Sequence, residues 1–307
     1  MTYEQQLDYL QKHKNLLITD RQYAKIMLER ISYYSLIGGY KEPFQHRPSG
    51  KFLHGVTFDE IVSFYRFDEQ LRLLFLKYIL QVERELKSLV SYYFSEKYGS
   101  DQAAYLDKHH FISGRKHKAQ VSYLVNTMKK LISLPNAYPY IAHHVKLYNN
   151  VPLWVSVNAM TFGTISKFYQ YMTNDLQVKV RNHYPVSSEK HLHLFITVLA
   201  RCRNACAHGD RLYCFKANGQ IPDTILHKKL NIPTRKGQYV QGKNDMFAII
   251  LALRYMLPKE EFKVFKTTLQ RLISKVTKEC PHVSENQILA EMGLPMNWAK
   301  ITLLKIR

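Results

Sequence analysis

The chain has 307 residues, 46% of them hydrophobic and 13% aromatic, which suffices to bury the core of one large or two modest domains and argues against disorder. Lys and Arg outnumber Asp and Glu by 44 to 24, and the formal charge of +20 favours polyanionic partners. With four cysteines, no apolar signal segment and no run of about 18 apolar residues, we expect no disulfide framework, no membrane partner and a cytoplasmic location.

The hydrophobic pattern is helical from the start of the chain. A loop is expected over 40–56, and the capping-box sequence from Thr57 to Glu60 then begins an apolar stripe that continues to about residue 97. A helix of that length would be roughly 60 Å long, so we expect it to kink or to serve as the spine of a bundle. Further helices are predicted over 3–12, 20–34, 118–133, 137–148, 161–172, 174–183, 189–208, 244–257, 259–279 and 284–292.

Evidence for strands is thin, and the only one expected is a small hairpin that pairs 236–240 with a segment of 211–217. The proline- and glycine-containing stretch 209–243 is predicted to be a loop between bundle helices. The sequence therefore predicts an all-α protein, with a helical domain over 1–215 and a basic helical C-terminal extension over 216–307 packed on it.

Positive charge is concentrated between residues 108 and 188, where Asp175 is the only acid beside ten Lys or Arg and six His. Aromatic residues such as Tyr123 and Trp154 interleave the basic ones. Cations beside exposed aromatic rings suit phosphate backbones and unstacked bases, so RNA is the expected partner. The candidate RNA contacts are Arg115, Lys116, Lys118, Lys129, Lys130 and Arg211.

Residues 194–210, LFITVLARCRNACAHGD, end an apolar helix in a polar group, and Gly209 is expected to terminate that helix. Asn204 and His208 would lie about 40° apart on one helical face, and Arg203 and His208 about 140° apart. An arginine can neutralise charge on a phosphodiester, and a histidine can exchange a proton with a 2′-hydroxyl or a leaving oxygen. Arg203, Asn204 and His208 are therefore the candidate catalytic residues of an RNA-cleaving site that needs no metal.

The same residues allow two other interpretations. The Arg–Asn–His group can cap the last carbonyls of the helix and complement the negative end of its dipole. Cys202, Cys206, His208 and Cys214 also provide four potential ligands for a soft metal. Because Cys202 and Cys206 lie on an apolar helix, we expect buried thiols there and no metal site.

Four segments, in order along the chain, resemble the Abi-like abortive-infection proteins of bacteria (the AbiD/AbiF group), members of the HEPN superfamily of R-x4-6-H ribonucleases. RNACAHGDRLY (203–213) is similar to the family signature RN-x-x-AH-x-x-RL-[WY]. Three other family blocks are matched by ISYYSLIGGYKEPF (31–44), TFDEIVSFYRFDEQLR (57–72) and VPLWVSVNAMTFGTISKFY (151–169).

This resemblance implies a HEPN-type helical bundle in a homodimer, in which Arg203 and His208 of both copies line one cleft, with Asn204 beside them. It implies an endoribonuclease that needs no metal or cofactor and leaves a 2′,3′-cyclic phosphate and a 5′-hydroxyl. The implied role is a toxin-like effector that halts phage-infected cells and is restrained by a bound small RNA. Two positions depart from the family pattern: Asn158 replaces a usual Glu, and Gly209 replaces a frequent second His.

Two further functions stay open. A non-catalytic RNA-binding protein on the same scaffold would behave identically with His208 intact or replaced by Ala. A basic protein–protein interaction module that meets an acidic partner would instead purify free of nucleic acid.

Overall fold

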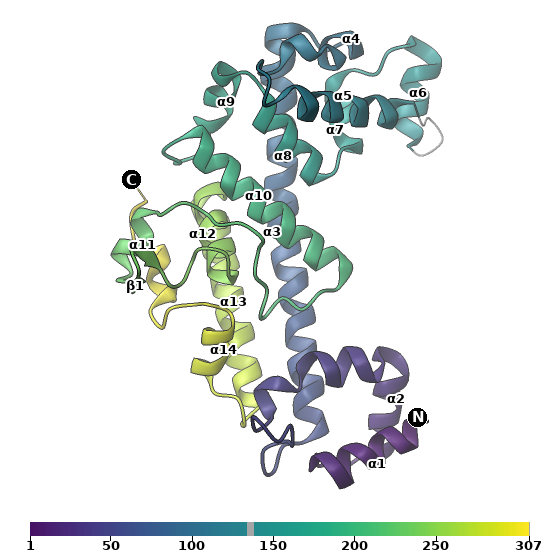
Figure 1. Cartoon of the computed structure of the whole chain (residues 1–307), viewed down its shortest axis with the longest axis vertical. Helices are drawn as coiled ribbons and strands as arrows, with labels where there is room; N and C mark the ends of the chain where they lie inside the picture. Colours follow the sequence, from purple (N-terminus) through teal and green to yellow (C-terminus); the bar gives the residue numbers. More distant parts are fainter. Residues whose placement is uncertain (134–137, 307) are drawn as a thin grey trace.

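The computed structural model describes residues 1–133 and 138–306, and helices dominate this part of the chain (Figure 1). The all-α class predicted from the sequence is confirmed. The α-helices are α1 Tyr3–Lys14, α2 Arg21–Ile31, α3 Phe58–Tyr98, α4 Gln102–Leu106, α5 Lys118–Ile132, α6 Pro139–Tyr148, α7 Leu153–Ala159, α8 Phe162–Tyr171, α9 Asn174–Arg181, α10 Glu189–His208, α11 Ile225–Lys229, α12 Met246–Met256, α13 Lys259–Glu279 and α14 Glu285–Glu291. Short π- or 3₁₀-segments are η1 Tyr34–Gly38, η2 Glu42–Phe44, η3 Lys108–His110 and η4 Trp298–Thr302.

Helix α3 is the spine of the molecule and runs along its longest axis (Figure 1). The helix begins as the sequence predicts, because the Thr57 hydroxyl accepts the N–H of Glu60 while the Glu60 carboxylate accepts the N–H of Thr57, each at 3.2 Å. It continues unbroken for 41 residues and packs against α7, α8, α9, α10 and α13. The sequence predicted that this helix would either kink or form the spine of a bundle, and the second prediction is correct.

One continuous hydrophobic core links the N-terminal and C-terminal parts of the chain. Every residue of α12 is buried, between α10 and α13. Helix α13 places Phe265 edge-on against Phe75 and Tyr78 of α3, with ring centroids 5.0 and 5.3 Å apart. The C-terminal helices therefore pack on the same core as α3 and α10, and the division into two units at residue 215 stays a prediction.

The hairpin exists, but the prediction named the wrong partner strand. Strand β2, Gln238–Tyr239, pairs with β1, Thr234–Arg235, and not with a segment of 211–217. Lys236 and Gly237 both adopt left-handed backbone conformations, with φ of 51° and 75°, and form the two-residue turn that joins adjacent strands.

The remaining differences concern helix ends and short helices. The helix predicted over 20–34 ends at Ile31 and gives way to η1, while the one predicted over 137–148 begins at Pro139, its first predicted residue lying outside the described part. Helices α4, α7 and α11 were not predicted because five to seven residues show too little periodicity. Among the described helices, none is long and apolar enough to cross a membrane.

Candidate functional site

The polar end of α10 is closed by a left-handed glycine, as the sequence predicts. Gly209 has φ 76° and ψ 19° and follows His208, the last helical residue. The N–H groups of Gly209 and Asp210 donate to the carbonyls of Cys206 and Ala205, at 3.4 and 3.0 Å. This arrangement satisfies carbonyls that a helix end otherwise leaves free, so they need no capping by the His208 side chain.

The three candidate catalytic residues lie on this helix end, but no hydrogen bond joins their side chains. Asn204 and His208 are exposed, one turn apart, and neither side chain forms a hydrogen bond within the described residues. Arg203 is half-buried and points toward α3, where its Nε lies 3.5 Å from Oε2 of Glu83. Ala207 is also exposed, so the surface around the imidazole is open to another molecule.

The acid that faces Arg203 is Glu83 of α3, which the sequence analysis missed. Glu83 is 4% exposed, and its Oε1 forms an ion pair with Lys87 Nζ at 2.9 Å. Its Oε2 and the Arg203 Nε are buried and have no partner at hydrogen-bond geometry, so the carboxylate pairs with Lys87 through one oxygen and faces Arg203 with the other. The available sequence signal was a carboxylate inside the apolar stripe of α3, four residues before a lysine.

Asn158, which stands where the resembled family usually has Glu, takes no part in this contact. It is exposed on α7, and its side-chain amide donates to the Trp154 and Val155 carbonyls of its own helix at 2.9 and 3.3 Å. The acid beside Arg203 therefore comes from the spine helix and not from the 151–169 block.

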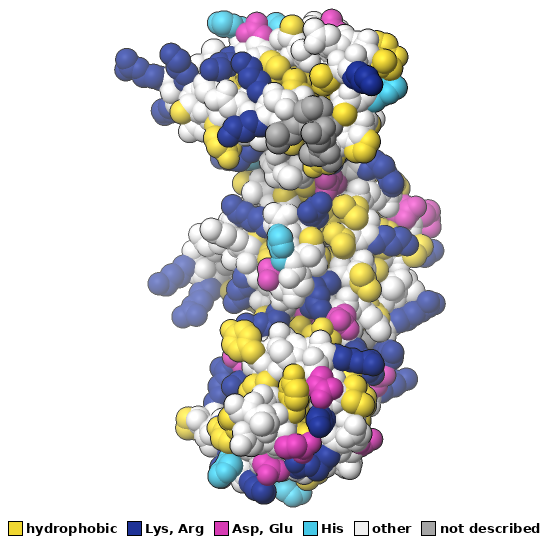
Figure 2. Space-filling model, turned by 90° about the vertical axis from the view of Figure 1, so that its right-hand side faces the viewer, with side chains coloured by type: hydrophobic (Ala, Val, Ile, Leu, Met, Phe, Trp, Pro, Cys, Tyr) yellow, Lys and Arg dark blue, Asp and Glu magenta, His cyan; other side chains and the backbone are white. Residues whose placement is uncertain are grey.

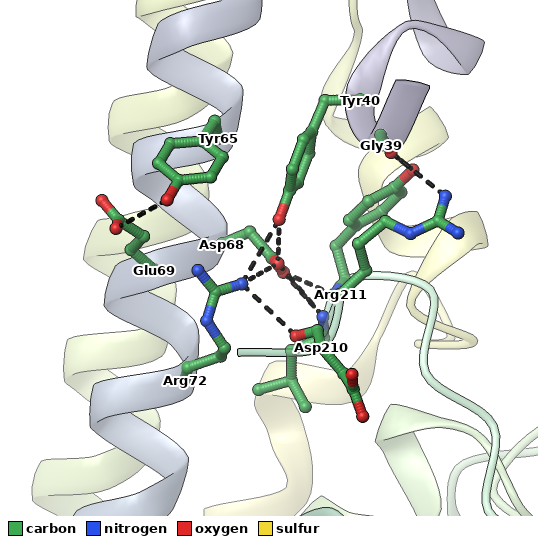
Figure 3. A network of polar contacts seen from close by, with 10 residues as sticks. Gly39, Tyr40, Tyr65, Asp68, Glu69, Arg72, Asp210 and Arg211 are labelled. Carbon is green, nitrogen blue, oxygen red and sulfur yellow. Dashed lines mark hydrogen bonds and ion pairs between the residues drawn. The ribbon is translucent and has the colours of Figure 1, made fainter. Parts of the chain in front are cut away.

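The segment after His208 is fixed by a buried polar network around Asp68 of α3 (Figure 3). The Asp68 carboxylate is fully buried and accepts hydrogen bonds from the Tyr40 hydroxyl at 2.8 Å and from Arg72 Nη1 at 2.5 Å. Burial and the nearby Asp68 charge raise the pKa of the Tyr40 phenol, so Tyr40 stays protonated and donates. Burial also raises the pKa of the Asp68 carboxyl, while the hydrogen bond from Tyr40 and the charge of Arg72 favour its charged form.

This network also binds the backbone that leaves α10. Asp68 accepts the N–H groups of Leu212 at 3.0 Å and Tyr213 at 2.7 Å, and Arg72 donates to the Asp210 carbonyl at 3.3 Å. Arg211 donates to the Gly39 carbonyl at 3.2 Å (Figure 3). The blocks 31–44, 57–72 and 203–213 thus meet in one cluster that sets where α10 ends, and with it where His208 is presented.

The candidate RNA contacts form two separate groups. Arg115 and Lys116 precede α5, Lys118 begins it, and Lys129 and Lys130 lie in its last turn; all five are exposed, without an acidic partner in the described chain. Lys118 and Lys129 lie about 20° apart around the helix and roughly 16 Å apart along it, in one row. Figure 2 shows several Lys and Arg side chains projecting at the end of the molecule that α5 occupies in Figure 1. Arg211 lies elsewhere, beside the end of α10.

A groove with a volume of about 490 Å³ lies between α5 and α8, on a different face of α5 from the row of Lys118 and Lys129. Tyr123, 77% exposed, stands on one side, and Lys167 on the other lies over the Tyr171 ring at 5.9 Å. Three threonines and a glutamine complete the polar part of the lining: Gln120, Thr127, Thr161 and Thr164. An exposed ring, hydroxyl groups and a cation can together hold an unpaired base and its phosphate.

The potential soft-metal ligands do not converge. Cys202 and Cys206 are buried in the core, as expected for small residues on an apolar helix, and burial raises the pKa of the Cys202 thiol well above its usual value. His208 is exposed at the end of the same helix. Elsewhere in the described chain, no group of three or more candidate ligands is close enough to hold a metal ion.

The fold and this helix end define an all-α protein that presents an Arg–Asn–x3–His group at the exposed end of a core helix. Residues 26–214 match the family model of the Abi-like proteins, and because this match covers more than half of the sequence, the chain belongs to the Abi-like protein family. No curated protein and no solved structure matches the chain. Family membership suggests a role in abortive infection, a defence against phage.

Proposed function

We propose that this protein is a metal-independent endoribonuclease that acts as the effector of an abortive-infection system. The observation that carries the proposal is the end of α10, where an exposed imidazole and amide stand beside an arginine held by a buried carboxylate. The surrounding backbone is fixed by the Asp68 network, and a rigid support is what a catalytic group requires.

In the proposed reaction, the 2′-hydroxyl of the RNA attacks the adjacent phosphorus, and the bond from phosphorus to the 5′-oxygen breaks. One imidazole takes the proton of the 2′-hydroxyl, and a second gives a proton to the leaving 5′-oxygen. Arg203 neutralises charge on the non-bridging oxygens. The products are a 2′,3′-cyclic phosphate and a 5′-hydroxyl end.

The proposed reaction needs two proton transfers, and two imidazoles can each perform one of them. Each chain offers one such imidazole, His208, at the end of α10. We therefore propose that the active form is a homodimer that brings two copies of His208 to one cleft. Support comes from Leu73 and Leu80 of α3, which are 68% and 42% exposed and lie on nearly the same face of the helix. Leu80 is one turn from Glu83, so these exposed leucines, with Lys77 and Arg84 beside them, reach the site and can contact a second copy.

We further propose that the row of cations on α5 and the neighbouring groove hold RNA. Their support is the absence of acidic partners in the described chain and the exposed Tyr123 ring. A small RNA bound there would restrain the enzyme in uninfected cells, by occupying the surface that substrate needs.

The test compares wild type with His208→Ala and Arg203→Ala, using RNA cleavage in the presence of a chelator and growth arrest on expression. Removing the general acid–base or the charge-neutralising group should lower the cleavage rate about 10²–10⁴-fold. His143→Ala, which removes an exposed histidine of α6, is the matched control and should cleave at the wild-type rate.

Full cleavage or full toxicity in either site variant would show that the site is assigned wrongly. RNA binding without cleavage in the wild type would favour the non-catalytic RNA-binding protein, for which the departures at Asn158 and Gly209 are the specific argument. Protein that purifies free of nucleic acid and does not bind RNA would favour the interaction module.

A further inference from the structure

Arg254 of α12 is a buried cation without a counter-charge. The residue is 8% exposed and has no acidic partner in the described part of the chain. Its Nη2 donates to the Leu304 carbonyl at 3.5 Å, its Nε has no partner, and its guanidinium lies 5.5 Å from the centre of the Phe262 ring. Burial lowers the pKa of Arg254, which reflects the cost of holding this charge away from water. Buried charges are normally paired, so this position calls for an anion.

Arg254 lines a cavity of about 370 Å³ that contains further cations. Lys259, Lys263 and Lys266 of α13 line it as well, and in the described residues none of them forms an ion pair. Glu260 is the one acid of the lining, against four cations. Two hydroxyl groups, of Thr267 and Thr302, are also present.

The start of α13 contributes free backbone N–H groups, and Glu260 and Glu261 in its first turn offset their partial charge. The helix begins at Lys259, and its N-cap residue, Pro258, provides no side-chain acceptor for the N–H groups of the first turn. Such free N–H groups give a helix N-terminus a partial positive charge. The buried arginine and the three lysines therefore carry the preference for an anionic ligand.

We propose that this cavity binds a phosphoryl group, either of a free nucleotide or of RNA. The planar guanidinium of Arg254 can donate two parallel hydrogen bonds to phosphate oxygens, and the lysines add charge at the rim. The volume lies within the roughly 300–1,000 Å³ of small-ligand pockets. The site is formed by α12, α13 and the η4 segment, which do not carry the Arg–Asn–His group, and it is independent of the proposed ribonuclease activity.

The first experiment measures binding to the full chain by calorimetry, with inorganic pyrophosphate as the probe. In the double variant Lys263→Gln/Lys266→Gln, the Kd should rise at least tenfold. The matched control Arg271→Gln/Lys278→Gln removes two exposed cations from the same helix, away from the cavity, and should bind as the wild type does. No pyrophosphate binding by the wild type, or equal Kd values for the wild type and the Lys263/Lys266 variant, would overturn the proposal.

The second experiment separates a ligand site from a structural role of Arg254. In phosphate-free buffer, Arg254→Met should melt at or above the wild-type temperature because it removes an unpaired buried charge at similar volume. Pyrophosphate should raise the Tm of the wild type and leave that of Arg254→Met unchanged. A variant that melts lower in free buffer and still responds to pyrophosphate would overturn the proposal.

Two further ligands identify the source of the phosphoryl group. The ligand is a nucleotide if ATP binds the wild type at least tenfold more tightly than pyrophosphate and RNA does not displace it. A single-stranded RNA that displaces pyrophosphate, without preferential binding of ATP, indicates RNA; comparing RNAs with and without a 5′-phosphate shows whether the RNA end is bound. Both results support the site, and in either case the Lys263→Gln/Lys266→Gln variant must bind the ligand more weakly than the wild type.

Discussion

Replacing Glu83 with Gln removes the charge that faces Arg203 and preserves the size of the side chain. At the observed 3.5 Å, the attraction between the two charges is about 5 kcal/mol for an effective dielectric constant of about 20. The desolvation of Glu83 and the partial exposure of Arg203, whose side chain is 30% accessible, offset much of this energy. We therefore expect Glu83→Gln to lower the free energy of unfolding by about 2 kcal/mol.

The same change should slow RNA cleavage. Without the carboxylate, Arg203 and Lys87 lose the negative charge that both approach, and the guanidinium is no longer held where the proposed reaction needs it. A loss of about 1.4–2.7 kcal/mol in transition-state stabilisation corresponds to a 10–100-fold lower rate. A double-mutant cycle of Glu83→Gln with Arg203→Gln in urea unfolding should give a coupling energy of about 1–3 kcal/mol.

Glu96→Gln is the matched control for this prediction. Glu96 lies on the same helix and pairs with Lys179 at 2.6 Å, but both side chains are more than 40% exposed. Such an exposed pair contributes at most about 1 kcal/mol, and cleavage should be unchanged. An effect of Glu83→Gln no larger than that of Glu96→Gln, on either stability or cleavage, would refute this role of Glu83.

Two other predictions address the basic surface and the response to pH. The double charge reversal Lys116→Glu/Lys118→Glu should weaken the binding of single-stranded RNA and reduce the salt slope by about 1–2, and unchanged binding would place the RNA elsewhere. Burial, with a smaller effect of Lys167, lowers the pKa of His193 from 6.5 to about 4, so the folded state binds this proton more weakly than the unfolded state. The resulting stability is present above pH 6.5 and lost as the pH falls toward 4. Between pH 7.5 and 4.5, the free energy of unfolding of His193→Gln should therefore fall by up to about 2.5 kcal/mol less than that of the wild type. An equal fall in the two proteins, measured by urea unfolding at both pH values, would contradict this role of His193.

The sequence by itself determined the features that depend on neighbours in the chain. The start of α3 follows from Thr57 and Glu60, three residues apart, and the end of α10 from Gly209, because caps are made by nearby backbone groups. The apolar stripes predicted the long helices, since burial on one face repeats with the helical period. The family to which the chain belongs also followed from the sequence, because each of its four motif blocks is a continuous stretch of chain.

Only the tertiary structure decided which distant residues meet. Asp68 accepts the N–H of Leu212, 144 positions away, and Glu83 of α3 faces Arg203 of α10. Arg254 likewise became a candidate ligand-binding residue only because the packing of α12 and α13 buries it without an acid. Such contacts depend on how helices cross and on which side chain reaches which neighbour. Local periodicity carries no information about that, because it fixes the buried face of each helix and not its partner.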